Sequence, residues 1–156
     1  VVEITQIKGD SEAHPFLSPD DQFADYESWD KSNIFNANVY TPEMLAGSYV
    51  REGLKRGLAL GQQLGVNPYQ FGVIGSTDSH TGLATADSKN YWGKSPLAGP
   101  TPARMQTDWA TAGKAGALIT VKNTESAASG YAAIWAKENT REAIFDAFAR
   151  REVYAS

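Results

Sequence analysis

The fold is decided by the stretch Phe71-Gly72-Val73-Ile74-Gly75-Ser76-Thr77-Asp78-Ser79-His80. Its opening residues, Phe71 to Ile74, form a short apolar run that is typical of a buried strand. Small and hydroxyl-bearing residues follow, and then come Asp78 and His80. In α/β proteins, the side chains at the carboxyl end of a strand face the usual site of chemistry. The stretch therefore predicts an α/β domain whose functional residues lie directly after this strand.

Asp78 and His80 are candidate metal ligands. A single residue separates them, so both side chains can converge on one ion. Carboxylate and imidazole groups suit Zn, Mn or Fe, and such an ion lowers the pKa of bound water and polarises an ester or phosphoryl oxygen. The alternative is structural, in which Asp78 caps a turn and His80 bonds the backbone. Because a catalytic zinc has about three protein ligands, the pair needs further partners.

The length and composition of residues 1–156 are those of a single globular domain. Of the 156 residues, 42% are hydrophobic and 21% are charged, and this length allows a hydrophobic core. The net charge of −4 argues against a nucleic-acid surface, which is normally basic. The absence of cysteine excludes disulfides, thiolate zinc sites and cysteine nucleophiles. No apolar run approaches the roughly 18 residues of a membrane span.

A strand and a helix are expected before the opening stretch. Residues 1–7 are β-rich and predict a first strand. Thr41-Pro42-Glu43 is typical of a helix start, and apolar residues then recur at helical spacing as far as Leu64, where Gly65 caps the helix. A helix that leads into a buried strand is half of a βαβ unit. We therefore expect one continuous helix ahead of the strand that begins at Phe71.

A glycine pattern marks one face of this predicted helix. Gly53, Gly57 and Gly61 occur at every fourth position, so they share one side. Charged residues between them exclude a membrane-spanning helix. Although each glycine costs up to about 1 kcal/mol in a helix, this pattern indicates close packing against another backbone.

A long loop and three further elements are expected after the opening stretch. Residues 81–116 are rich in Gly, Pro, Ser, Thr and Ala, and we expect an ordered lid or substrate loop because loops of this length are usually functional or disordered. Residues 116–121 fit either a strand or a helix. Residues 129–136 predict a strand, and Asn139 opens a last helix through a capping box with the glutamate three positions on.

Three ionisable residues near the start of the chain are further candidates. Glu3 lies in the predicted first strand, where a buried carboxylate is costly unless it is paired or bound to a metal. The alternative for Glu3 is an edge position that faces solvent. Glu12 and His14 are one residue apart in the following loop and could ligate a metal or bind a substrate. The alternative for this pair is a solvated loop that ends at a proline.

The long loop carries two candidates for substrate binding. Arg104 could clamp a phosphate, sulfate or carboxylate, and the alternative is an ordinary surface arginine. Trp92 could stack on a sugar or an aromatic ring, and the alternative is that it fastens the loop to the core. The chain has no phosphate-binding loop, dinucleotide fingerprint or serine-hydrolase elbow. Asp78 and His80 therefore remain the sharpest signal of chemistry.

These residues resemble a known superfamily. Residues 71–80 look like the closing Asp-x-His motif of the PHP (polymerase and histidinol phosphatase) superfamily of metal-dependent hydrolases. The surrounding chain is similar to an uncharacterised bacterial branch of that superfamily, a domain of unknown function. The similar segments span the chain and comprise Val2-Glu3-Ile4 with Lys8-Gly9-Asp10-Ser11-Glu12, Gly130-Tyr131-Ala132-Ala133-Ile134-Trp135-Ala136, Glu138-Asn139-Thr140-Arg141-Glu142-Ala143-Ile144 and Arg150-Arg151-Glu152-Val153-Tyr154-Ala155-Ser156.

The resemblance implies a distorted β/α barrel with up to three metal ions at the carboxyl ends of its strands. It implies that Asp78 and His80 ligate different ions of this cluster, and that Glu3 is a further ligand unless the bridging glutamate comes from an earlier strand. The opening His-x-His motif and the middle histidines of the superfamily are absent from the chain. We therefore expect the C-terminal part of a longer enzyme, with an incomplete barrel and no activity alone.

Three hypotheses of function follow. The first is hydrolysis of a phosphoester or related ester in a small-molecule substrate, with divalent Zn, Mn or Fe ions as cofactors. The second is a non-catalytic module of the same fold that binds a small anion or sugar through Arg104 and aromatic residues. The third is an interaction piece whose exposed barrel edges pair with another copy. The expected protein partners are the N-terminal part of the parent protein or further copies of this chain.

Overall fold

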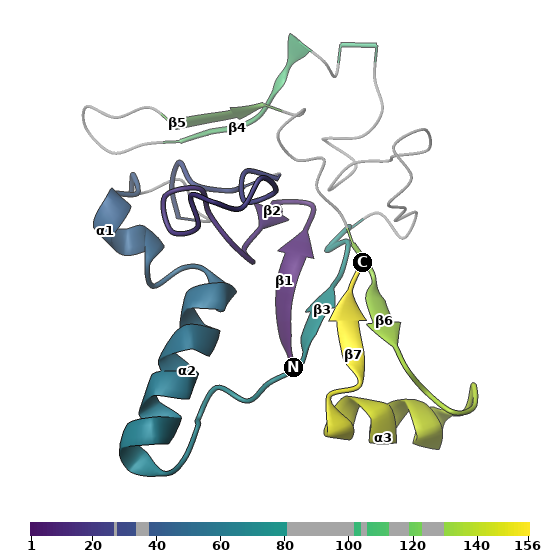
Figure 1. Cartoon of the computed structure of the whole chain (residues 1–156). Coiled ribbons are helices and arrows are strands. Elements are labelled where there is room, and N and C mark those ends of the chain that lie inside the picture. Colours follow the sequence, from purple (N-terminus) through teal and green to yellow (C-terminus); the bar gives the residue numbers. More distant parts are fainter. Residues whose placement is uncertain (27, 34–37, 81–101, 104–105, 113–118, 123–129) are drawn as a thin grey trace.

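The computed structural model describes residues 1–26, 28–33, 38–80, 102–103, 106–112, 119–122 and 130–156, which form a mixed α/β fold (Figure 1). This confirms the predicted α/β class. No helix in these ranges is long and apolar enough to cross a membrane. In chain order the elements are β1 (Val2–Gln6), β2 (Gly9–Asp10), α1 (Pro42–Leu45), α2 (Val50–Leu64), β3 (Val73–Gly75), β4 (Asp108–Ala112), β5 (Ile119–Lys122), β6 (Ala132–Ile134), α3 (Arg141–Arg150) and β7 (Val153–Ala155).

A parallel pair of strands forms the centre of the fold. β1 lies between β2, which is antiparallel to it, and β3, which is parallel to it. Val2 is opposite Val73 and Thr5 is opposite Gly75, with a shift in register between them. Both strands were predicted, and both are confirmed. Because they run in the same direction, their carboxyl ends meet at one edge, where the Ile7 amide donates to the Thr77 carbonyl at 3.3 Å.

The C-terminal strands continue this layer beyond β3. β6 and β7 pair antiparallel, and β7 contacts both β1 and β3. Figure 1 shows β1, β3, β7 and β6 in one row, with α2 beside β1 and α3 at the foot of β6 and β7. Tyr131 and Ser156 exchange two backbone hydrogen bonds of 2.9 and 3.1 Å where the row ends. Within the described ranges the row of strands stays open and does not close into a barrel.

The continuous helix predicted from Thr41 to Leu64 is wrong, because the chain breaks between α1 and α2. Tyr49 adopts extended backbone angles at the break and buries its side chain, of which only 5% is exposed. The first amides of α2 are satisfied from elsewhere: the Val50 amide donates to the Ser11 carbonyl and the Arg51 amide to the Glu12 carbonyl, at 2.9 and 3.0 Å. The loop after β2 therefore sets where α2 begins.

The predicted glycine packing is confirmed at two of the three positions. A Cβ atom on Gly57 would overlap Asn67 Oδ1 and lie 2.9 Å from the Cβ atom of Tyr69. A Cβ atom on Gly61 would lie 3.3 Å from the Cβ atom of Asn67. Gly53 faces open space, so the prediction is wrong there. The segment after α2 thus folds back onto the helix at Gly57 and Gly61 and directs the chain into β3.

Alanine at Gly57 and at Gly53 should have opposite effects on stability. Gly57→Ala should lower the free energy of unfolding by about 2 kcal/mol, because the added methyl group displaces the segment that holds Asn67. Gly53→Ala should raise it by up to about 1 kcal/mol, because alanine is the better helix former and nothing obstructs its side chain. Urea denaturation of both variants measures the two changes. Equal stabilisation by both would contradict the packing of Asn67 on α2.

The structure settles several C-terminal expectations. Residues 119–122 form the strand β5, which resolves the ambiguity between strand and helix for the described part of residues 116–121. The predicted loop 81–116 contains a strand, β4, in its described part. The predicted last helix is confirmed as α3, but its N-cap is Thr140 rather than Asn139. The Thr140 hydroxyl accepts a hydrogen bond from the Ala143 amide at 3.3 Å, which satisfies one of the free amides at the helix start.

Candidate functional site

Asp78 and His80 lie together at the carboxyl edge of the parallel pair. Asp78 Oδ1 is 3.2 Å from His80 Nε2. The other carboxylate oxygen of Asp78 accepts a hydrogen bond from the ammonium group of Lys8, which stands in the turn between β1 and β2. The side chains of Lys8 and Asp78 are 15% and 27% exposed, so the pair is partly shielded from water. This strand edge thus combines a carboxylate, an imidazole and a cation.

The backbone at Asp78 adopts a left-handed conformation. Its φ angle is 47°, and among the described non-glycine residues only Arg151 shares a positive φ. Aspartate tolerates this region better than most residues but still at some cost. The Ser79 amide donates to the Thr77 hydroxyl at 3.3 Å within the same turn. Sharp backbone turns of this kind persist where the surrounding structure enforces them, and they concentrate at functional sites.

Asp78 and His80 contact each other directly, and their spacing also fits a shared divalent ion. Two atoms that each bind a tetrahedral zinc at about 2.1 Å lie about 3.4 Å apart, close to the 3.2 Å between Asp78 Oδ1 and His80 Nε2. The described part of the chain holds no group of three or more His, Cys, Asp or Glu residues that could bind a metal. Within the described residues, Asp78 and His80 are therefore at most two ligands of an ion.

Glu3 is held by neighbours other than Asp78 and His80. One carboxylate oxygen accepts a hydrogen bond from the Ser76 hydroxyl. The other accepts from Gln6 Nε2 at 3.0 Å. The residue is exposed, although β1 is the central strand of its sheet, so the expected edge position is wrong and the expected exposure to solvent is confirmed. Glu3 therefore lies near the exit of β3 through Ser76, and its role as a metal ligand stays a prediction.

Glu12 and His14 turn to different partners. Glu12 Oε1 pairs with Arg51 at 2.6 Å. His14 Nδ1 accepts a hydrogen bond from the Phe16 amide at 3.1 Å, and His14 Nε2 lies 3.2 Å from an oxygen of Asp30. When the ring is neutral, its proton is on Nε2 and points to Asp30, because Nδ1 acts as the acceptor. Both nitrogens of His14 are thus used within the protein, which favours a structural role.

Arg51 is a residue that sequence reasoning missed. Its guanidinium joins Glu12 to Asp21, with an N–O distance of 2.5 Å to Asp21. This hydrogen bond lowers the pKa of the Asp21 carboxyl below its ordinary value and raises the pKa of Arg51. A cation in the first turn of a helix opposes the helix dipole. That unfavourable position was the signal that acidic partners had to lie nearby.

Two predicted residues and two missed residues remain to be considered. Arg104 and Trp92 lie outside the described residues. Lys8 binds Asp78, and Ser76 binds Glu3. Neither Lys8 nor Ser76 was among the predicted site residues. Their role could not be read from sequence because each bond joins residues 70 or more positions apart.

Comparison with known proteins places the chain in a family. A family model described as "Protein of unknown function (DUF3604)" matches residues 1–156. The chain belongs to the DUF3604 family. The match confirms the resemblance to a domain of unknown function over the whole chain. No curated protein and no solved structure matches the chain. For a DUF3604 domain, the function must therefore be inferred from the residues themselves.

Proposed function

We propose that this DUF3604 domain is part of a metal-dependent hydrolase of the PHP superfamily that acts on a phosphoester or related ester of a small molecule. One observation carries the proposal: Asp78 and His80 converge at the carboxyl edge of β1 and β3, with Asp78 held in a left-handed turn. This edge is where α/β proteins place their chemistry. In this proposal the open row of strands is a portion of a β/α barrel.

Asp78 and His80 would hold a divalent ion such as Zn, Mn or Fe. When bound, the ion supplies a water of lowered pKa as nucleophile and polarises the ester oxygen. Lys8 fixes the orientation of the Asp78 carboxylate through their ion pair. Ser76 and Gln6 hold the Glu3 carboxylate at the neighbouring position.

Titration with Mn²⁺ and Zn²⁺ tests the proposal on this chain. Paramagnetic broadening by Mn²⁺ should first affect the NMR signals of Asp78 and His80. Residues that merely orient a metal ligand already change affinity about 10–100-fold, so Asp78→Ala and His80→Ala should each weaken Zn²⁺ binding by at least about tenfold in calorimetry. Asp146→Ala, an exposed carboxylate on α3, is the matched control and should leave the affinity unchanged.

Two results would count against the proposal. One is broadening that spreads evenly over the acidic surface of the protein and does not concentrate at Asp78. The other is Zn²⁺ affinity that Asp78→Ala and Asp146→Ala change equally. Either result would show that the strand edge has no preference for a divalent ion.

A further inference from the structure

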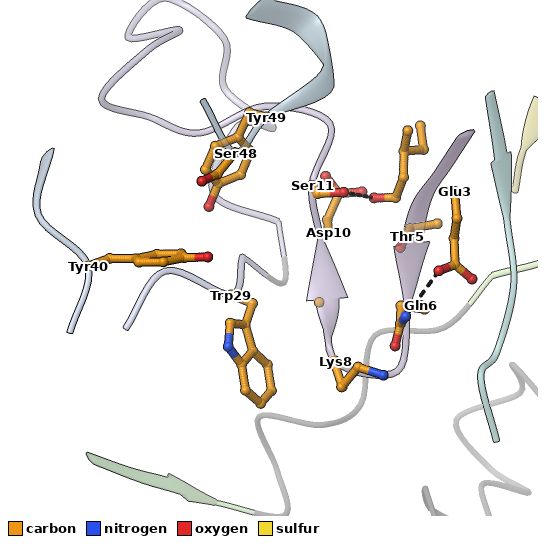
Figure 2. A pocket seen from close by; sticks show the side chains of 12 residues that line it. Glu3, Thr5, Gln6, Lys8, Asp10, Ser11, Trp29, Tyr40, Ser48 and Tyr49 are labelled. Carbon is orange, nitrogen blue, oxygen red and sulfur yellow. Dashed lines mark hydrogen bonds between the residues drawn. The ribbon is translucent and has the colours of Figure 1, made fainter. Parts of the chain in front are cut away.

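Both oxygens of the Asp78 carboxylate are engaged by neighbouring side chains. Oδ1 lies 3.2 Å from His80 Nε2, and Oδ2 accepts a hydrogen bond from the Lys8 ammonium group. Figure 2 shows Lys8 in the turn of the β1–β2 hairpin, below Gln6 and Glu3 on β1. A divalent ion at Asp78 would therefore share this carboxylate with a cation that the protein itself supplies.

The hairpin turn holds the backbone of Lys8 close to the strand edge. Gly9 has a φ angle of 124°, a conformation that residues with a side chain rarely adopt, and it lets the chain reverse directly after Lys8. On the other side of Lys8, the Ile7 amide donates to the Thr77 carbonyl at 3.3 Å. The backbone at Lys8 is thus anchored, and its side chain is the part that can move away from Asp78.

Charge repulsion opposes the simultaneous presence of Lys8 and a divalent ion at Asp78. The Lys8 and Asp78 side chains are 15% and 27% exposed, so water screens their charges only in part. Two cations on one carboxylate repel each other strongly under these conditions. Asp78 without any cation is unfavourable as well, because a partly shielded carboxylate that loses its partner carries an uncompensated charge. One cation at a time therefore suits Asp78 best.

The Lys8 side chain has room to leave Asp78. Lys8 lines a cavity of ≈ 210 Å³, which Figure 2 shows from close by. Lysine carries its ammonium group on a flexible stem and binds as a point charge, so it can leave one acceptor without a change in the backbone. Exchange of Lys8 for an ion at Asp78 therefore requires the movement of one side chain.

The turn at Asp78 is also held by contacts that do not involve Lys8. The Ser79 amide donates to the Thr77 hydroxyl at 3.3 Å, and His80 contacts the other carboxylate oxygen of Asp78. These contacts still orient the carboxylate when Lys8 is replaced. For metal binding, the loss of a competing cation should therefore outweigh the loss of orientation.

We propose that Lys8 competes with a divalent ion for the Asp78 carboxylate and is released when the ion binds. Lys8 holds the carboxylate in its orientation until the ion takes its place, and it lowers the affinity of Asp78 and His80 for that ion. This inference rests on the proposed metal site, and it adds a residue that regulates the occupancy of that site.

Calorimetric titration of Lys8 variants with Zn²⁺ tests the inference. Lys8→Met removes the cation at similar side-chain length and should bind Zn²⁺ at least about tenfold more tightly than the unaltered protein. Lys8→Gln, which keeps a hydrogen-bond donor without the charge, should show the same gain, and Lys8→Arg should not. Lys55→Met, which removes a lysine paired with Glu52 on α2, is the matched control and should leave the affinity unchanged. In the double variant Lys8→Met/Asp78→Ala the gain should disappear, because it acts through the Asp78 carboxylate.

Thermal unfolding with and without Zn²⁺ separates competition from a purely structural role of Lys8. In EDTA, Lys8→Met should melt at a lower temperature than the unaltered protein, because Asp78 loses its partner. Saturating Zn²⁺ should narrow this difference, because tighter binding to the folded protein stabilises the variant more. A melting temperature lowered equally with and without Zn²⁺, at unchanged Zn²⁺ affinity, would show a structural role alone and overturn the inference.

The Asp78→Ala variant distinguishes a failure of this inference from a failure of the metal site. If Asp78→Ala weakens Zn²⁺ binding but Lys8→Met does not strengthen it, the metal site stands and the role of Lys8 is overturned. If Asp78→Ala has no effect on Zn²⁺ affinity with either residue at position 8, the metal site is wrong and the inference falls with it.

Discussion

Gly130→Ala is expected to lower the free energy of unfolding by about 3 kcal/mol, because the added methyl group has no space. Its Cβ atom would lie 2.5 Å from the Ser156 carbonyl oxygen and 2.8 Å from the Cγ2 atom of Thr5. The first of these neighbours is backbone, which cannot rotate away. Relief would require β6 and β7 to separate at the backbone bonds between Tyr131 and Ser156. Urea denaturation followed by circular dichroism measures the loss.

Alanine substitutions at two further glycines serve as comparisons for the loss of stability expected at Gly130. Gly75→Ala should destabilise less, because its closest neighbour is the methyl group of Thr5 at 2.9 Å and the nearby carbonyl oxygens are at 3.1 and 3.2 Å. Gly53→Ala introduces the same chemical change into open space. If Gly130→Ala were as stable as the unaltered protein, the close approach of the C-terminal strands to β1 and β3 would be contradicted.

Ile7→Ala is expected to cost about 3 kcal/mol, the usual consequence of removing a fully buried aliphatic side chain. Ile7 is 1% exposed and stands directly after β1. Its amide donates to the Thr77 carbonyl, next to Asp78, so a cavity here also loosens the segment that presents Asp78. Denaturation should show the loss of stability, and the NMR signals of His80 should shift or broaden in the same variant.

Conservative and exposed substitutions serve as controls for Ile7. Ile7→Val should cost about 1 kcal/mol, because it removes a single methylene group. Leu58→Ala removes a similar side chain from the surface of α2, where Leu58 is 71% exposed, and should change stability by less than about 0.5 kcal/mol. A loss at Leu58 equal to that at Ile7→Ala would mean that the core is not centred on β1.

Local patterns were sufficient to predict the strands around the site. The apolar run before Gly75 and the β-rich start of the chain each carry their own signal, and both form the strands expected of them. The parallel pairing of these strands brings Asp78 to the edge where it was expected. Residue spacing along the chain also placed His80 beside Asp78, because two residues so close in sequence can hardly diverge.

Features that depend on distant contacts could not be predicted. The break before α2 arises because the carbonyl groups of Ser11 and Glu12 satisfy the helix start, and nothing near Tyr49 encodes their position. Tyr49 falls within the range of the predicted helix and is buried, but it lies outside α2 as its N-cap residue. The same limit applies to Lys8, whose partner Asp78 is set by the fold alone.

The parallel pairing of β1 with β3 also bears on how fast the chain folds. Lys8 and Asp78 are 70 positions apart in the sequence. Closing this loop costs conformational entropy, and contacts at the strand edge can offset that cost only after the loop has closed. The hydrogen bonds within α2 are local and can form early, and the return segment at Asn67 shortens the effective loop. The strand edge that carries Asp78 and His80 should therefore be among the last parts of the molecule to assemble.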